Sequence, residues 1–182
     1  MVHSYYCLSL SLSCNLFHMK EQVSWLSRHI TLHSYQDTIS EKENSISHAV
    51  GSALSLIFLI TVLFLKGHFV SHSTYVGMVI FSLSQLILFT SSAIYHKVEK
   101  GDLKRLFRIF DHSTIYFLIA GTYTPIMLFI NSASTRIILM CVYLFLVAGV
   151  LSTIFFWGKF KVLHVLLYLF MGWSIVLVWD EV

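Results

Sequence analysis

The chain has 182 residues and a mean hydropathy of +0.76; 57% of its residues are hydrophobic and only 12% are charged. Soluble domains carry about 25% charged residues, so this composition excludes an ordinary soluble protein, and one proline with eight glycines excludes a collagenous or low-complexity chain. The net charge of +3 does not point to a nucleic-acid partner, because the basic residues stand between long apolar runs.

The first 40 residues are expected to form an N-terminal extension that is poorly ordered or lies at the membrane surface. Its run YYCLSLSLSCNLF is too short to span a bilayer, and it lacks the basic flank and small-residue cleavage site of a signal peptide. Residues 20–43 are suited to a short surface helix. The three cysteines (Cys7, Cys14 and Cys141) form no CxxC pattern, and we interpret them as unpaired thiols.

A transmembrane domain is predicted over residues 41–182. From residue 44 onwards, five stretches contain no Asp, Glu, Lys or Arg: 44–65, 67–96, 112–135, 137–158 and 162–179. About 20 apolar residues in a helix cross a bilayer, so each stretch is long enough for one span. The sequence therefore predicts an all-α polytopic bundle in the lipid bilayer, with spans at about 46–66, 73–96, 112–131, 136–157 and 162–179.

The basic residues predict how these spans are oriented. With a cytoplasmic N-terminus and five crossings, ten of the twelve Lys and Arg residues fall on the cytoplasmic side, and only Lys66 and Arg136 fall outside. Basic residues in short loops are retained in the cytoplasm, so this split favours a cytoplasmic N-terminus. We expect a multi-pass protein of the plasma membrane with the segment 97–111 as a cytoplasmic loop.

Ionisable residues stand at the cytoplasmic ends of the second and third spans. Ser92 and His96 are four residues apart and share one helical face, and Asp111-His112 begins the third span. In one interpretation His96 is an interfacial residue and Asp111 caps a helix N-terminus. In the other, the imidazole faces the bundle interior and binds a metal while the carboxylate orients a metal-bound water. The spacing of these residues fits both interpretations.

The first and fifth spans carry further polar residues on the same side. Asn44 and His48 share a face in the first span, and capping explains Asn44 better than it explains His48, which lies a turn inside the apolar run. Glu41 and Glu43 are expected to be solvated. In the fifth span, His164 is interpreted as an interfacial residue one turn before Tyr168.

Several motifs in order resemble a known family. ENSISHAVG, SSAIYH, DHSTIYFLIAGTYTP and LYLFMGW are similar to the signatures of the haemolysin III family, which is grouped with the progestin and adiponectin receptors and resembles the alkaline ceramidases. The resemblance covers about Glu41 to Trp179. It implies a seven-span membrane fold with a cytoplasmic N-terminus, of which five spans are present here.

The resemblance also implies a zinc site near the cytoplasmic face. In the wider superfamily three histidines hold the ion, one at the end of the second span and an HxxxH pair in the seventh. His96 matches the first histidine, and Ser92 and Asp111 match residues associated with the zinc-bound water, which such a site would activate for hydrolysis. No HxxxH follows His164 in this sequence. We therefore interpret the chain as C-terminally incomplete and expect that it does not bind zinc tightly alone.

Three functions follow as hypotheses. The first is that of a haemolysin III family membrane protein with a haemolytic or pore-forming role. The second is a zinc-dependent hydrolase of a lipid amide, with His96 as a metal ligand and Asp111 and Ser92 as catalytic residues; whether the chain is an enzyme stays open. The third is a receptor or sensor.

Overall fold

The computed structural model describes residues 24–32, 37–68, 71–159 and 161–181, and the chain in these ranges is helical without any strand. The all-α transmembrane fold is confirmed, because five helical segments are long and apolar enough to cross a bilayer. The segments are α3 (Thr38–Phe64), α4 (His72–Lys97), α5 (Asp102–Ile130), α6 (Ala133–Phe155) and α7 (Lys161–Trp173) continued by the 3-10 helix η2 (Ser174–Glu181). Two short helices, α2 (Trp25–His29) and η1 (Lys66–His68), complete the described elements. Most of the predicted N-terminal extension lies outside the described residues.

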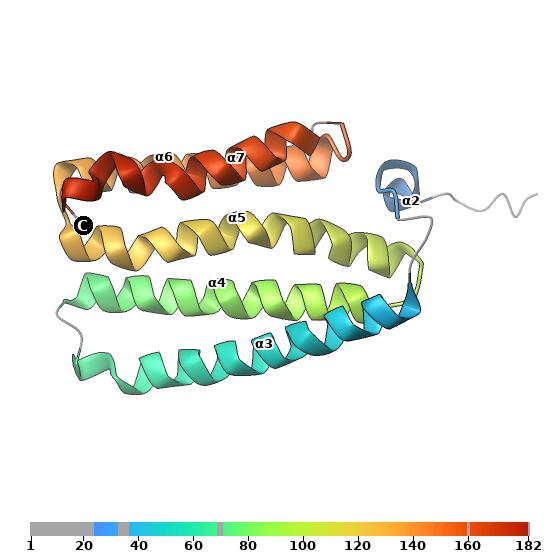
Figure 1. The fold of residues 1–182 in the computed structure, drawn as a ribbon, viewed down its shortest axis with the longest axis horizontal. Coiled ribbons are helices and arrows are strands. Elements are labelled where there is room, and N and C mark those ends of the chain that lie inside the picture. The colour runs from blue at the N-terminus through green and yellow to red at the C-terminus, as the bar shows by residue number, and fades with distance from the viewer. Residues whose placement is uncertain (1–23, 33–36, 69–70, 160, 182) are drawn as a thin grey trace, which may run out of the picture.

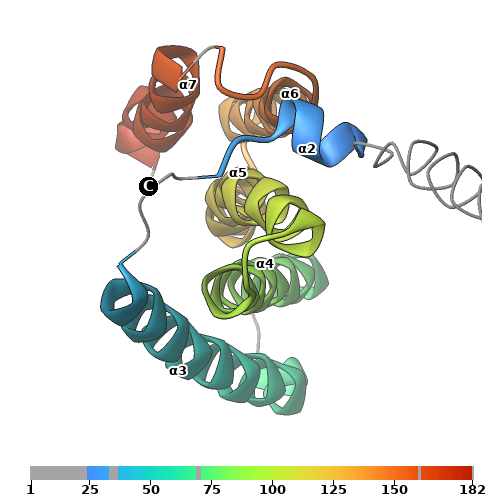
Figure 2. The ribbon, with the colours of Figure 1, turned by 90° about the vertical axis from the view of Figure 1, so that its right-hand side faces the viewer.

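The long helices lie side by side along one common direction (Figure 1). Helix α3 packs on α4, α4 on α5 and α5 on α6, while α7 contacts both α5 and α6. Viewed from the end, α3, α4 and α5 follow one another, and α2 lies against α5 (Figure 2). Short connections between long helices force each pair to run antiparallel, which gives this order of neighbours.

The turn between α5 and α6 is the tightest of the bundle. Only Asn131 and Ser132 separate the two helices, and Asn131 takes the left-handed conformation with φ of 54°. The Ser132 and Thr135 side chains form a reciprocal capping box at the start of α6. Arg136 donates to both the carbonyl and the side-chain oxygen of Asn131 at 3.1 Å, which closes the turn.

Helix α5 begins earlier than the charge-free run from residue 112 suggested. It starts at Asp102, so the cytoplasmic loop expected over 97–111 is a short connection followed by helix. The sequence LKRLFRIF alternates apolar and basic residues at helical spacing, and Lys104 and Arg108 are buried although both are cationic. These two side chains are accommodated because other elements supply partners for them, as described below.

Small residues allow close helix contacts. A Cβ atom on Gly77 of α4 would lie 2.7 Å from the backbone of Pro125 in α5, and α5 continues as a helix through this proline. The buried hydrophobic cluster lies among α5, α6, α7 and η2 and includes Tyr116, Met127 and Met171. Large apolar side chains such as Phe64, Leu144, Val162 and Leu177 remain exposed on the outside, where lipid would cover them.

Candidate functional site

Polar residues of the first two spans meet between α3 and α4. His48 Nδ1 lies 2.6 Å from Ser92 Oγ, and the rings of His48 and His96 are 5.6 Å apart and nearly perpendicular. Ser92 and His96 thus share the face of α4 that packs on α3, which agrees with their predicted common face. We name the α3–α4 polar cluster by its members, Glu41, Ser45, His48, Ser92, His96 and Lys104.

Glu41 belongs to this cluster, so the expectation that it is solvated is wrong. Its Oε2 lies 2.7 Å from Lys104 Nζ and 3.5 Å from His96 Nδ1. Lys104 is 2% exposed, also donates to the carbonyl of Val98, and lies over the ring of Tyr95 at 5.0 Å. Lys104 approaches Glu41 because α5 starts early enough to carry its ammonium to the first turn of α3, and a buried ammonium strongly favours a carboxylate partner.

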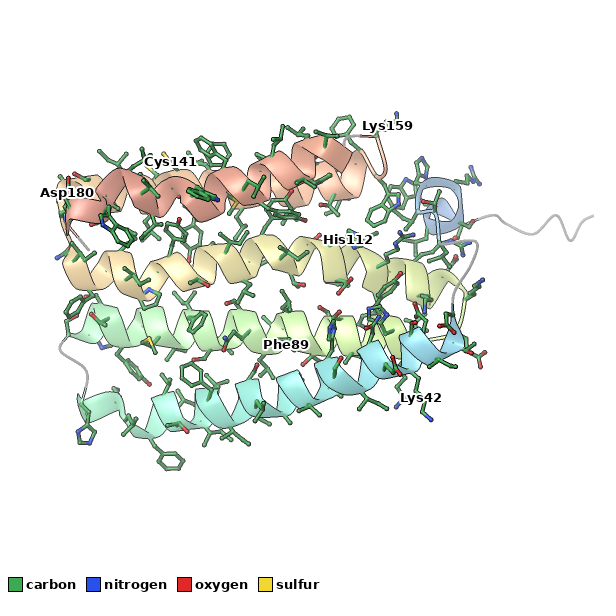
Figure 3. The ribbon with its side chains drawn as sticks, viewed as in Figure 1. Lys42, Phe89, His112, Cys141, Lys159 and Asp180 are labelled. Atoms are coloured by element: carbon green, nitrogen blue, oxygen red, sulfur yellow. The ribbon has the colours of Figure 1, made fainter. Side chains whose placement is uncertain are left out.

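Hydroxyl groups extend the contact between α3 and α4. Ser45 donates to the carbonyl of Ala93 at 3.1 Å, and Ser52 and Thr90 share a hydrogen bond of 2.7 Å. These bonds lie within apolar helices, where unsatisfied polar groups are costly. A cavity of about 730 Å³ lies at the outer end of the cluster, where Lys42, His96 and Lys100 are among its lining residues. Figure 3 shows Lys42 at this end of the bundle, the same end as Lys159.

Asp111 lies within α5 and not at its start. Gly101 is the N-cap of α5, so Asp111 is in the third turn and the helix-capping interpretation of this aspartate is wrong. Its Oδ2 is 3.8 Å from Nδ1 of His112, and its side chain is 20% exposed. His112 Nδ1 also lies 3.0 Å from the carbonyl of Arg108, one turn earlier. The described contacts thus link Asp111 to His112.

A second polar group joins α5 to α7. His164 Nδ1 lies 2.7 Å from the hydroxyl of Tyr116, and the Tyr168 hydroxyl donates to the carbonyl of His112 at 3.2 Å. Tyr116 itself is fully buried. His164 is therefore a packed residue with a specific partner as well as a residue near the end of its span. The sequence offered no signal for the Tyr116 contact, because the partners are 48 residues apart.

The described residues do not form a complete zinc site. Structural zinc ions have four protein ligands and catalytic ones usually three. Within the described ranges no three His, Cys, Asp or Glu side chains come close enough to hold a metal. Within the same ranges, His96 Nδ1 is buried and has no hydrogen-bond partner, and the side chains of Glu41 and His48 lie close to the His96 ring. His96 as a zinc ligand, with Ser92 and Asp111 as catalytic residues, stays a prediction.

Comparison with known proteins identifies the family. The model of the "Haemolysin-III related" family matches residues 36–181. The chain belongs to the haemolysin III family. It is 34% identical over 142 residues to a "Hemolysin-3 homolog" of Bacillus subtilis (strain 168), a match that covers 77% of this chain and 67% of that protein. It is 32% identical over 137 residues to "Hemolysin-3" of Bacillus cereus, covering 75% and 63% of the two chains. The chain thus spans about two thirds of the length of these haemolysin III relatives. No solved structure matches it.

Proposed function

We propose that this multi-pass haemolysin III protein permeabilises lipid bilayers. The observation that carries the proposal is the family match over residues 36–181, which includes all five transmembrane segments. Two relatives that are 34% and 32% identical to it over the aligned residues bear the name hemolysin. The permeabilising role itself is inferred from those names.

The packing of a single chain favours small openings over a wide channel. Most buried hydroxyls in the described helices bond to carbonyls of their own helix, as Ser55 does to Gly51 and Thr153 does to Gly149. Because Ser55 and Thr153 are also buried, these hydroxyls do not line an open aqueous path within one chain. We therefore propose that leakage is limited to small solutes and rises steeply with the number of protein copies per vesicle.

Dye release from liposomes tests the proposal. The purified full chain is reconstituted into vesicles that contain a small fluorescent dye and a large fluorescent dextran, at increasing protein-to-lipid ratios. We expect the dye to escape and the dextran to remain. No dye release at the highest ratio would overturn the proposal.

Two glycine variants distinguish specific leakage from damage by unfolded protein. A side chain at Gly149 would strike the ring of Tyr116, whereas nothing lies within 4 Å of a Cβ at Gly172. Vesicles that contain Gly172→Leu should therefore release dye as vesicles with the wild type do, whereas vesicles that contain Gly149→Leu should not. Equal leakage from both would show that misfolded protein disrupts the vesicles and would contradict a specific activity.

We further propose a cytoplasmic N-terminus in the plasma membrane. The distribution of basic residues supports this orientation, because Lys97, Lys100 and Lys104 lie together at the connection between α4 and α5. Lys66 lies at the opposite end, in η1. In a background with the native cysteines replaced, a membrane-impermeant maleimide applied to intact cells should label Lys66→Cys and spare Lys100→Cys. The reverse pattern would contradict the orientation.

A further inference from the structure

A second cavity lies on the other side of α5 from the α3–α4 polar cluster. It has a volume of about 520 Å³, within the usual range for ligand pockets, and is bounded by α5, α6, α7 and the segment after α2. Its lining includes Arg108, His112, Trp157 and His164. The cavity lies at the end of the bundle that carries the turn between α6 and α7, and Figure 3 labels Lys159 of this turn beyond His112.

Arg108 is the buried cation of this cavity. It is 8% exposed, its Nη1 donates to the carbonyl of Thr31, and its guanidinium lies 5.2 Å from the ring centre of Trp157. The carbonyl and the indole ring orient the guanidinium. A planar guanidinium held in this way is suited to bidentate bonds with a phosphate.

The other polar groups of the cavity come from three helices. His112 adds an imidazole whose Nδ1 bonds to the Arg108 carbonyl, and its ring lies 5.1 Å from that of Trp157. His164 and Tyr168 of α7 also line the cavity, and Thr153 of α6 adds a hydroxyl. Asp111 is the acidic group nearest to this set in the described contacts, with its Oδ2 3.8 Å from His112 Nδ1. No Asp or Glu is among the described lining residues, and Arg108 is their one Lys or Arg.

The walls of the cavity connect to the lipid-facing surface. Val165 lines the cavity and is 54% exposed, and Ile115 and Leu32 add further apolar surface. A ligand with its anionic group at Arg108 would pass Val165 and continue along the outside of α7. Basic side chains at the same end, among them Lys97, Lys100 and Lys159, would attract an anionic membrane surface.

We propose that this cavity binds the phosphate-bearing headgroup of an anionic phospholipid, with Arg108 as the principal contact and the acyl chains along α7. Phosphate chemistry alone would also fit a free anion. The apolar wall at Val165 favours the lipid, because a free phosphate would gain nothing from it. This site is separate from the α3–α4 polar cluster and does not depend on the permeabilising function.

Thermal stabilisation in detergent measures the binding, because a ligand that binds only the folded state raises the unfolding midpoint. The full chain in a neutral detergent is titrated with phosphatidylglycerol, phosphatidylcholine or inorganic phosphate. We expect phosphatidylglycerol alone to raise the midpoint in a saturable way. Equal stabilisation by phosphatidylcholine would overturn the anion site, and stabilisation by inorganic phosphate at the same concentration would overturn the lipid as occupant.

Matched variants locate the site. Arg108→Gln should weaken phosphatidylglycerol binding at least tenfold, whereas Arg105→Gln, which removes the same charge from a residue that bonds to Asp102 and Ile30 outside the cavity, should not. Equal weakening by both variants would show a general charge effect and overturn the proposal.

A second pair of variants leaves the buried guanidinium intact and therefore tests the site even if Arg108→Gln unfolds the protein. Val165→Trp fills the opening, while Val162→Trp changes a residue of the same helix that is 72% exposed and does not line the cavity. We expect tenfold weaker binding for the first and unchanged binding for the second. Wild-type affinity in Val165→Trp would contradict the proposed route of the acyl chains.

Discussion

The backbone of Gly149 on α6 lies directly against the ring of Tyr116 on α5, so that a Cβ atom at position 149 would meet Tyr116 Cε1 at 2.3 Å. Tyr116 is completely buried and its hydroxyl is held by His164, so the ring has little room to move. The close approach of α5 and α6 therefore depends on the missing side chain.

We expect Gly149→Ala to lower the free energy of unfolding by about 1–3 kcal/mol, the usual cost of overpacking a core. Thermal unfolding in detergent micelles measures the change. Gly172→Ala is the control, because nothing lies within 4 Å of its Cβ position, and it should be neutral or stabilising by up to about 1 kcal/mol. A neutral Gly149→Ala would show that the two helices separate at little cost.

The hydroxyl of Tyr123 joins α5 to the junction of α7 and η2. It donates to the carbonyl of Gly172 at 2.9 Å and accepts from the backbone N–H of Ile175 at 2.8 Å and from Ser174 Oγ at 3.1 Å. Tyr123→Phe removes all three hydrogen bonds at this junction, so we expect a loss of about 1–3 kcal/mol in unfolding free energy. Tyr143 is more exposed and, among the described residues, its hydroxyl has one hydrogen bond, to Thr124, so Tyr143→Phe should lower the unfolding free energy by less. Equal effects would contradict the bridging role.

The ion pair between Glu41 and Lys104 should couple α3 to α5 energetically. Lys104→Met and Glu41→Gln are each expected to destabilise the protein by about 1–3 kcal/mol, less than for a fully buried pair because the Glu41 side chain is 22% exposed. The double variant should cost clearly less than the sum of the two. Asp102→Asn, in a more exposed pair with Arg105, should change stability by under about 1 kcal/mol. If the double variant lowers the unfolding free energy by the full sum of the two single variants, the pair contributes no coupling.

Asp37 predicts a pH dependence at the start of α3. Hydrogen bonds from the backbone N–H of Ile39 and the hydroxyl of Ser40 hold the pKa of this exposed carboxyl below its usual value of 3.8. A lowered pKa means that the stabilisation is complete above about pH 3.8 and is lost as the pH falls through the lower, folded-state value. The difference in unfolding midpoint between wild type and Asp37→Ala should therefore be positive at pH 6 and shrink as the pH falls through the lowered pKa. Asp37→Asn keeps a capping side chain without a titrating group, so it should stay close to the wild type at pH 6. A difference that does not vary with pH would contradict the role of the carboxylate.

Zinc content tests the prediction carried by His96. A single imidazole with neighbouring oxygen groups is a poor zinc site, so we expect the purified chain to retain well under one zinc per molecule after dialysis. His96→Ala should remove any residual binding, and His68→Ala, in η1 at the opposite end, should not. Elemental analysis by mass spectrometry measures both. A full equivalent of zinc that survives in His96→Ala would exclude this residue as a ligand.

The sequence predicted five helices long and apolar enough to cross a membrane, because bilayer thickness sets the length of an apolar run and charged residues mark its ends. It also placed Ser92 and His96 on one helical face and drew attention to His48, which contacts Ser92. It could not predict that α5 begins at Asp102, because Lys104 and Arg108 are tolerated only through partners 63 and 77 residues away along the chain. For the same reason it assigned Glu41 to solvent.

The two-residue turn at Asn131 and Ser132 has a consequence for the order of folding. Closing so short a connection costs little chain entropy, so α5 and α6 can associate before contacts between distant segments form. Helix α7 packs on both members of this hairpin, and the side chains of Ser132 and Glu181 bond across its turn. We therefore expect α7 to assemble on the α5–α6 hairpin, and a longer linker at this turn to slow assembly more than the same insertion between α3 and α4.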